Sequence, residues 1–374
     1  MGMLPTKNFQ EGVFDDADKI DGAGEQFGKL LVGRDNCTGC PIRCKRVVEG
    51  SFVGRTIERR YGGPEYETAA ALGSFCMNAS AEAISLANQL CNAYGLDTIS
   101  VGVSIAFAME ASEKGLIPEK VHWGDPEAVV GLVEDIAFRR GLGNRLAEGI
   151  DRLASELGAD FAMHIKGQEI PMHDPRGKVG VGLSYATTPR GGQHMEALHD
   201  PAYEAGGLGK HGNSDVGVYG PLDRLSWDRK ARFIKVYQDL ASFSNSAISC
   251  AYVGFDAAMP LGFNPYPKLR EAIYAATGLE IGAREMLEIG ERNFNLLKIA
   301  AVLDGYGREH DDLPARLKTA LPRGASANAP IPDDVLQSQI NEYYRYRGWD
   351  DSGPTDELLT RLGMNEFIGY KRGV

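Results

Sequence analysis

Residues 80–114 read SAEAISLANQLCNAYGLDTISVGVSIAFAMEASEK. Ser80 is a residue type that caps helix N-termini, and Gly95 is the type that most often ends a helix in the left-handed conformation. We therefore predict one helix that begins after Ser80 and stops at Gly95, and a second, capped by Thr98, that runs to about Lys114. Strand-like alternation is scarce along the chain, so the sequence predicts a mostly α fold.

The same start and stop signals predict further helices on both sides of this pair. Expected helical segments lie within 12–32, from 64 (with Pro64 in the first turn) to 79, from 125–126 onward, and at 144–157, 227–244 and 283–304, with two short helices in 332–364. Residues 45–57 are β-prone. We expect two domains, 1–162 and 163–374, and an exposed connector at 322–332.

Residues 164–220 differ from the rest because they are rich in Gly, Pro, His and Arg and hold few periodic runs. Long irregular segments inside a compact domain are usually functional or disordered. The frequent aromatic and aliphatic residues argue against disorder. This stretch is therefore expected to carry active-site loops.

A cysteine run lies closer to the N-terminus. Cys37, Cys40 and Cys44 are spaced C-x2-C-x3-C, which places three thiols within eight residues, with Gly39 and Pro41 between them. Three thiolates on one short loop can face one inorganic centre, and cubane iron–sulfur clusters take four thiolates. The sequence therefore favours an iron–sulfur cluster, with the distant Cys250 as a candidate fourth ligand.

Two alternatives for the run fit less well. Structural zinc sites usually show two spaced pairs of ligands, and no second pair and no nearby His accompany this run. Disulfides are disfavoured because only 6 of 374 residues are Cys and no secretory signal is present. Cys76 and Cys91 fall in predicted helices and are interpreted as core residues, although Cys91 is the one substitute if Cys250 is not a ligand.

Composition limits the class of protein. The formal net charge is −11, which argues against nucleic acid or an anionic membrane surface as the main partner. No stretch approaches the roughly 20 apolar residues that a membrane helix needs. We therefore expect a cytoplasmic protein of ordinary globular composition, in a compartment where thiols stay reduced.

Many short motifs, in order over nearly the whole chain, resemble the second and third domains of the aldehyde ferredoxin oxidoreductase family, the tungsten–pterin enzymes. The matching pieces are Leu4–Phe9, the cysteine run, Gly63–Thr68, Gly95–Ser100, Asp174–Gly177, Arg190–His194, Gly290–Arg292, Asp312–Pro314 and Tyr343–Trp349. A single piece would be weak, but their common order is specific. The resemblance implies a multihelical fold of two all-α domains, a bis-pterin tungsten (or molybdenum) centre and a 4Fe–4S cluster.

For the metal ligands, the resemblance assigns Cys37, Cys40 and Cys44 to the cluster and a fourth thiolate to a remote D-x-x-G-L-C motif. In this sequence that motif reads Asn245-Ser246-Ala247-Ile248-Ser249-Cys250, so only its cysteine is kept. Cys250 remains the expected fourth ligand. Asn245 stands in place of the first Asp of the motif and is the expected pterin contact.

For the pterin, the resemblance points to a D-x-x-G-L-D motif, which here contains Asn92, Gly95, Leu96 and Asp97. Backbone amides at such a helix–Gly–helix turn suit a phosphate or heterocycle edge, although an ordinary capped turn gives the same pattern. Arg176 and Arg190 flank Gly-rich turns, and each is interpreted either as a pterin-phosphate contact or as half of a buried ion pair.

For proton chemistry, the resemblance places a Glu of the Gly-Pro-Glu-Tyr-Glu-Thr stretch and a His of the Arg-Gly-Gly-Gln-His stretch near the metal. The corresponding residues are Glu67 and His194, with Glu65 as the rival of Glu67. Residues two apart on a helix do not share a face, so only one of the two glutamates is expected to face the metal. A Glu can take a proton from water, and a His can protonate or orient a carbonyl oxygen.

Family members also carry a first, β-sheet domain that supplies much of the pterin cradle, and no part of this sequence corresponds to it. We expect that domain to come from another segment or chain, and the single chain not to retain tungstopterin. The predicted activity is oxidation of a small aldehyde to a carboxylic acid, with ferredoxin or a small iron–sulfur subunit as electron partner and a homo-oligomer left open. The alternatives are an iron–sulfur electron-transfer or assembly module, or a subunit of an aromatic acyl-thioester reductase.

Overall fold

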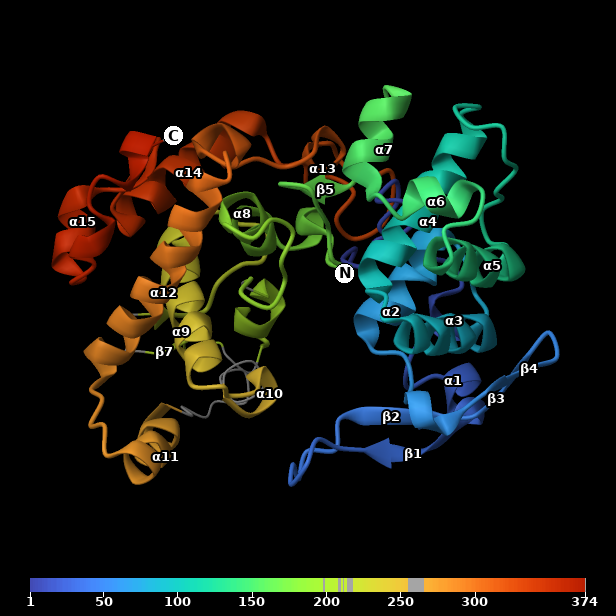
Figure 1. Cartoon of the computed structure of the whole chain (residues 1–374), viewed down its shortest axis with the longest axis horizontal. Coiled ribbons are helices and arrows are strands. Elements are labelled where there is room, and N and C mark those ends of the chain that lie inside the picture. Colours follow the sequence, from blue (N-terminus) through green and yellow to red (C-terminus); the bar gives the residue numbers. More distant parts are fainter. Residues whose placement is uncertain (198, 208–209, 211, 214–217, 255–265, 374) are drawn as a thin grey trace. The chain divides into compact units, whose positions relative to one another are not determined.

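The structure, a computed structural model, describes residues 1–197, 199–207, 210, 212–213, 218–254 and 266–373. These residues form mainly helices, and their strands pair only two by two, so the predicted mostly α fold is confirmed (Figure 1). The chain divides into two compact units, Met1–Asp174 with Pro314–Asn328 and Pro175–Leu313 with Ala329–Val374. The predicted division after residue 162 stays a prediction.

The first unit joins helices to three antiparallel strand pairs, β1 with β2, β3 with β4 and β5 with β6. Its elements are α1 (Glu25–Leu30), β1 (Leu31–Asp35), β2 (Lys45–Val48), β3 (Gly50–Phe52), β4 (Arg55–Ile57), α2 (Tyr66–Ala71), α3 (Ala81–Tyr94), α4 (Thr98–Glu113), α5 (Pro126–Ala137), α6 (Leu142–Leu146), α7 (Ile150–Leu157), β5 (His164–Ile165), β6 (Gln168–Glu169) and α13 (Ala315–Lys318). The β-prone prediction for residues 45–57 is confirmed.

The core of the first unit is built by α3 and α4, which are buried along most of their length. Gly102 on α4 lets this helix approach α2 closely, because a Cβ at Gly102 would lie 2.6 Å from the carbonyl carbon of Ala71. Cys76 and Cys91 are fully buried, which confirms their prediction as core residues. Burial raises the pKa of both thiols, that of Cys91 to about 12, so neither is disposed to act as a thiolate.

The caps of these helices were predicted only in part. Ser80 caps α3, since its Oγ accepts a hydrogen bond of 3.1 Å from the Ala83 amide, and Gly95 ends the helix at φ 71°. The prediction that Thr98 caps α4 is wrong. Asp97 is the cap, and its carboxylate accepts from the Ser100 amide at 2.8 Å. Pro64 likewise lies outside the first turn of α2, which begins at Tyr66.

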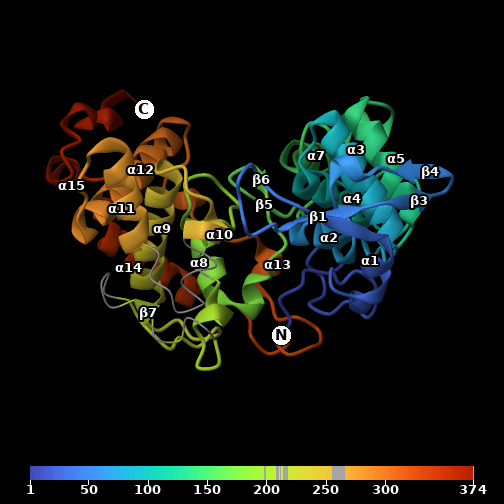
Figure 2. The same ribbon diagram turned by 90° about the horizontal axis from the view of Figure 1, so that it is seen from below.

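Where the structure describes it, the second unit is mainly helical, with two short strand pairs. Its elements are α8 (Val179–Thr187), β7 (Gly212–Asn213), β8 (Val218–Tyr219), α9 (Lys230–Ser246), α10 (Ala251–Gly254), α11 (Tyr266–Thr277), α12 (Ala283–Leu303), α14 (Asp333–Arg347), β9 (Trp349–Asp350), β10 (Gly353–Pro354) and α15 (Asp356–Arg361). Helices α9 and α12 pack side by side, in Figure 1 and again in Figure 2. Helix α8 lies inside the stretch that was predicted to be irregular.

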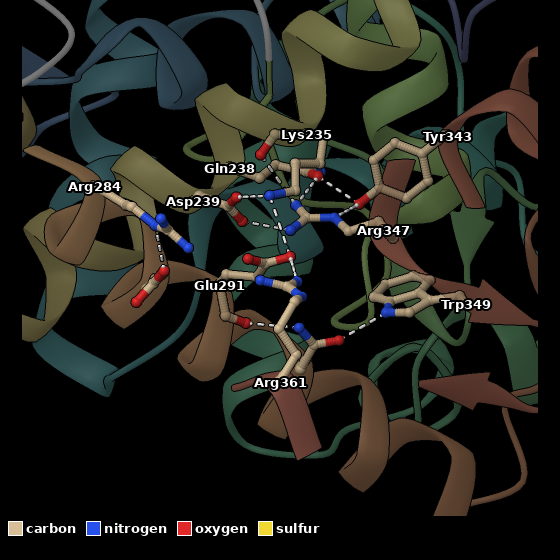
Figure 3. A network of polar contacts seen from close by, with 11 residues as sticks. Lys235, Gln238, Asp239, Arg284, Glu291, Tyr343, Arg347, Trp349 and Arg361 are labelled. Carbon is tan, nitrogen blue, oxygen red and sulfur yellow. Dashed lines mark hydrogen bonds and ion pairs between the residues drawn. The ribbon is translucent and has the colours of Figure 1, made fainter. Parts of the chain in front are cut away.

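A buried ionic network joins α9, α12 and α14 (Figure 3). Arg347 is fully buried; it is paired with Asp239, and it donates to Gln238 Oε1 at 2.8 Å and to the Tyr343 hydroxyl at 2.8 Å. Lys235 bridges Asp239 at 2.7 Å and Glu291 at 3.2 Å. A buried charge is tolerated only when it is paired in this way, so the network fixes the packing of the three helices. It thereby holds α9, which carries Asn245 near its end.

Among the described residues no single helix is both long and apolar enough to cross a membrane. One bent pair, α3 with α4, passes that test when its two helices are taken together, by length and composition only. The same two helices form the buried core of the first unit.

Candidate functional site

The cysteine run forms the tip of the β1–β2 hairpin in the first unit. The strands pair up to Asp35 opposite Lys45, and residues 36–44 make the connecting loop. Gly39 adopts φ 74°, a conformation that a residue with a side chain rarely takes, and the Cys40 amide donates to the Cys37 carbonyl at 2.9 Å. The loop therefore turns tightly between its first two cysteines.

The three thiols of this loop are free. Cys37 and Cys44 are exposed, Cys40 is half-buried, and none of the described cysteines forms a disulfide. The contacts that fix the loop run through other groups, such as the 2.7 Å hydrogen bond from the Arg43 guanidinium to the Arg34 carbonyl. The backbone is thus held while all three sulfurs remain available. Cys250, in the second unit, is also an exposed free thiol.

A carboxylate–imidazole pair forms at the start of α2. Glu67 Oε2 accepts from the Met172 amide at 2.7 Å, and its Oε1 lies 2.9 Å from His173 Nε2. Both side chains are only 14% exposed. The Tyr66 ring stacks on the His173 ring at 5.0 Å, and its hydroxyl donates to the Met172 carbonyl at 2.7 Å. Glu67 is therefore fixed in position by a segment about a hundred residues away.

The two rival glutamates have different surroundings. Glu65 is the exposed residue at the N-cap of α2, and its side chain makes no capping hydrogen bond. Glu67, in the first turn, is mostly buried; its Oε2 accepts a hydrogen bond and its Oε1 lies 2.9 Å from His173 Nε2. This difference favours Glu67 as the functional carboxylate. His173 was not predicted, because no spacing in the sequence links it to α2. It directly precedes the motif Asp174–Gly177.

The predicted pterin motif forms the exposed turn between α3 and α4. Asn92 donates from its side-chain amide to the Asn88 carbonyl at 2.9 Å, and Asp97 is occupied with capping α4. The Leu96 amide closes the turn by donating to the Cys91 carbonyl at 2.9 Å. Asn92, Gly95 and Asp97 are solvent-exposed and Leu96 is half-buried. The turn is therefore accessible, but its polar side chains already serve the local helix ends.

Two of the predicted cofactor residues, Arg190 and Asn245, contact the same carboxylate in the second unit. That carboxylate, Glu196, was not predicted. Arg190 is paired with Glu196, and Asn245 donates its side-chain amide to the same Glu196 Oε1 at 3.1 Å. Burial raises the pKa of Glu196, while Arg190 and Arg347 oppose that shift. Arg190 thus makes an ion pair with a buried carboxylate while its own side chain is 40% exposed, and its contact with a pterin phosphate stays a prediction. Glu196 could not be singled out from sequence because it stands alone among ordinary loop residues.

The remaining predicted residues of the second unit lie in its loops. Arg176 is fully buried in the short turn Pro175–Gly177 that precedes α8. His194 is half-buried, and its carbonyl accepts from the Ala197 amide at 3.0 Å. His199 and Asp200 follow in the same loop and were not predicted. Asp200 is fully buried and paired with Lys230, which is also fully buried.

The described residues define a mostly α protein with short strand pairs, and the comparisons give its family. The family model described as aldehyde ferredoxin oxidoreductase, domains 2 and 3, matches residues 1–364. The chain belongs to the aldehyde ferredoxin oxidoreductase family.

Three similar proteins illustrate the relationship. The chain is 35% identical to the tungsten-containing aldehyde ferredoxin oxidoreductase of Pyrococcus furiosus over 378 residues and 34% identical to that of Thermococcus kodakarensis over 379; each match covers 98% of this chain. It is 28% identical over 88% of its length to the WOR-like subunit of an aliphatic sulfonate oxidoreductase of Pyrococcus furiosus, of which it covers 50%. The chain spans 58% of the length of the two aldehyde oxidoreductases.

A solved structure shows the same fold. The active-site complex BamBC of benzoyl coenzyme A reductase, in complex with 1,5-dienoyl-CoA, matches 93% of this chain and 55% of its own chain with a TM-score of 0.67. Its sequence identity of 21% supports a shared fold only.

Proposed function

We propose that this chain supplies the second and third domains of a tungsten–pterin oxidoreductase that converts an aldehyde to a carboxylic acid and passes the electrons to ferredoxin. The observation that carries the proposal is the match, across 98% of the chain, to enzymes named as tungsten-containing aldehyde ferredoxin oxidoreductases. The thiol-bearing hairpin and the Glu67–His173 pair supply local chemistry of the required kind.

The thiols fit an iron–sulfur cluster. Cys37, Cys40 and Cys44 are free and lie on one tightly turned loop, and thiolates are the ligands such clusters take. Cys250 is proposed as the fourth thiolate that a 4Fe–4S cluster needs, because it ends the sequence motif to which the family resemblance assigns that ligand. Such a cluster would accept electrons one at a time and pass them to ferredoxin.

The pterin assignment has a narrower basis. Gly95 and Leu96 present an exposed backbone turn, where a heterocycle or phosphate edge can approach, with Asn92 and Asp97 beside it. Arg176 is buried within the turn Pro175–Gly177 before α8 and is proposed as a phosphate contact. Arg190 and Asn245 are proposed to act through Glu196, which both of them already contact.

The reaction adds one water to the aldehyde and releases two protons and two electrons as the carboxylic acid forms. The metal–pterin centre, when bound, supplies the two-electron acceptor. Glu67 is proposed to take the proton from water. Its Oε2 is held by the Met172 amide, and its Oε1 lies 2.9 Å from the His173 ring. His194 is proposed to donate a hydrogen bond to the carbonyl oxygen of the aldehyde, which polarises that bond.

The test is assembly followed by assay. The chain would be produced anaerobically with tungstate, alone and together with the segment by which its relatives are longer. We expect the assembly to bind tungsten and to reduce a viologen dye when an aldehyde is added. Glu67→Gln should lower the activity at least about 100-fold, which is the lower end of what a general base usually contributes. Glu65→Gln is the matched control and should retain it.

An assembly that binds tungsten and iron but oxidises none of a panel of aliphatic and aromatic aldehydes would contradict the proposed reaction. The same assembly should then be tried with an aliphatic sulfonate, because one of the similar proteins is a subunit of an aliphatic sulfonate oxidoreductase. An iron-loaded chain that passes electrons but shows no turnover in any assembly would instead favour the electron-transfer module.

A further inference from the structure

The loop that carries His194 is anchored at the start of α8 by two adjacent residues. Asp200 is fully buried and accepts the Gly180 amide at 3.2 Å and 3.1 Å on its two oxygens. The residue before it, His199, places its Nδ1 3.1 Å from Lys178 Nζ. Lys178 and Gly180 flank the first residue of α8, so the end of the loop docks on the helix N-terminus, where a carboxylate is favoured.

The Lys178 contact determines which ring nitrogen of His199 carries the proton. A lysine ammonium has three donors and no acceptor, so a hydrogen bond to it requires a bare, accepting Nδ1 on the imidazole. The proton of a neutral His199 then resides on Nε2. This agrees with the second contact of the ring, because Nε2 lies 3.3 Å from the His194 carbonyl oxygen, which can only accept. Two separate contacts thus specify the same tautomer.

Through that second contact His199 holds the backbone of His194. The His194 carbonyl receives the Ala197 amide at 3.0 Å as well as the His199 ring. Lys178, which sets the ring, is itself more than nine-tenths buried and has little freedom to leave. Through His199, the backbone of His194, five positions earlier in the chain, is in this way linked to the first turn of α8.

We propose that Lys178 and His199 form a positioning pair, in which the buried ammonium fixes the Nε2–H tautomer of His199 so that this ring holds the backbone of His194 in place. Neither residue touches the reacting atoms, so the pair acts through His194. The catalytic meaning of the pair rests on the proposed function, whereas the tautomer and its link to His194 do not.

The test is histidine nuclear magnetic resonance on the full chain. Long-range proton–nitrogen correlations of a sample labelled in its histidines report the tautomer of each ring. His199 and His194 would be assigned by the loss of one ring signal in His199→Gln and His194→Gln. At pH 7 we expect His199 as the Nε2–H tautomer, and a His199 that is the Nδ1–H tautomer or doubly protonated would overturn the proposal.

Coupling to His194 is tested with two variants of the same residue. Lys178→Met removes the donor, and the pure Nε2–H signature of His199 should be lost together with a shift of the His194 ring signals. Lys178→Arg keeps a buried donor and should restore both. His310→Gln, at an exposed histidine of the same unit, is the control and should shift neither. His194 signals that stay unchanged while His199 changes would overturn the positioning role.

Failure of this inference is separable from failure of the proposed function. If His194→Ala retains full aldehyde activity in the assembled enzyme, the catalytic role of His194 is wrong while the tautomer result stands. If that variant is inactive but His199 shows the Nδ1–H tautomer, the proposed function stands and the positioning pair is wrong. Should Lys178→Met fail to fold, the wild-type tautomer still decides the first point.

Discussion

The two loops that carry the proposed site residues are held in opposite ways. The loop at residues 36–44 is a hairpin tip whose thiols are exposed or half-buried; it is held by the backbone bond from Cys40 to Cys37 and by the Arg43 guanidinium on the Arg34 carbonyl. The loop at residues 190–200 is fastened by buried charges, with Glu196 on Arg190, His199 on Lys178 and Asp200 on Lys230. The first loop leaves its thiols accessible, as the proposed cluster requires, while the second is held by interactions within the protein.

The difference teaches where the folding energy of each loop comes from. A cluster that binds thiolates contributes its binding free energy to the segment that carries them, so a loop of this kind can leave its sulfurs open until metal arrives. A loop with buried charges must satisfy them itself, because an unpaired buried charge costs several kcal/mol. Substitutions in the two loops should therefore differ in size and in their dependence on iron.

The largest effect is expected at Lys230. Lys230→Met leaves the fully buried Asp200 without its cation, and breaking a buried pair in this way costs about 3–5 kcal/mol. The free energy of unfolding by urea, followed with a probe in the second unit, measures it. Lys268→Met is the control, since its pair with Glu271 is exposed and should contribute at most about 1 kcal/mol. Equal costs for the two variants would contradict the account.

A smaller loss is expected at Asn245. Asn245→Ala removes the amide that donates to the buried Glu196 Oε1, and a lost hydrogen bond to a charged group costs about 1.5–3 kcal/mol. The same urea titration measures this change. Asn293→Ala is its control, because the hydrogen bond from the Asn293 side chain to Ser246 lies at an exposed position and joins two uncharged groups. A loss at Asn245 no greater than that at Asn293 would show that Glu196 does not need its second donor.

Glu196 itself predicts a dependence on pH. Burial raises its pKa in the folded chain above the ordinary 4.5, so the folded state binds this proton more tightly than the unfolded state. Its contribution to stability is complete below pH 4.5 and is lost as the pH rises through the raised pKa. Glu196→Gln cannot titrate, so its free energy of unfolding relative to wild type should increase from pH 4 to pH 8. A constant difference across that interval would contradict the raised pKa.

The smallest effect is expected in the cysteine loop without metal. Cys37→Ser changes an exposed side chain, and in iron-free protein it should alter the free energy of unfolding by no more than about 0.5 kcal/mol. In iron-loaded protein the same change should remove a large part of the metal-dependent stability, which thermal unfolding in both states would measure. A strong destabilisation of the iron-free form would show that the loop, like residues 190–200, is organised by its own side chains.

Local signals in the sequence predicted much of the fold. Ser80, Gly95 and Asp125 act within a few residues of the helix ends they mark, and the structure confirms all three. Thr98 was assigned the cap of α4 although Asp97 takes it, because both residue types cap well and their order cannot decide. Helix α8 was missed because it is buried on every side, so it has no amphipathic period, and it contains two glycines.

The site was predictable only where its residues are close in sequence. The spacing of Cys37, Cys40 and Cys44 is visible in the chain and predicts a shared centre whatever the fold. The partners of Glu67 lie at Met172 and His173, about a hundred residues away, and only the folded chain brings them together. Glu196 and His199 were missed for a related reason, since a buried acid and a neutral imidazole are defined by their surroundings rather than by their neighbours in sequence.

The central claim, that the chain holds an iron–sulfur cluster on its cysteine hairpin, is tested most directly by metal analysis with low-temperature electron paramagnetic resonance of anaerobically prepared, reduced protein. The account predicts about four irons per chain and a cluster signal that disappears when Cys37, Cys40 and Cys44 are replaced by serine. Protein that contains zinc only, with no cluster signal, would contradict it.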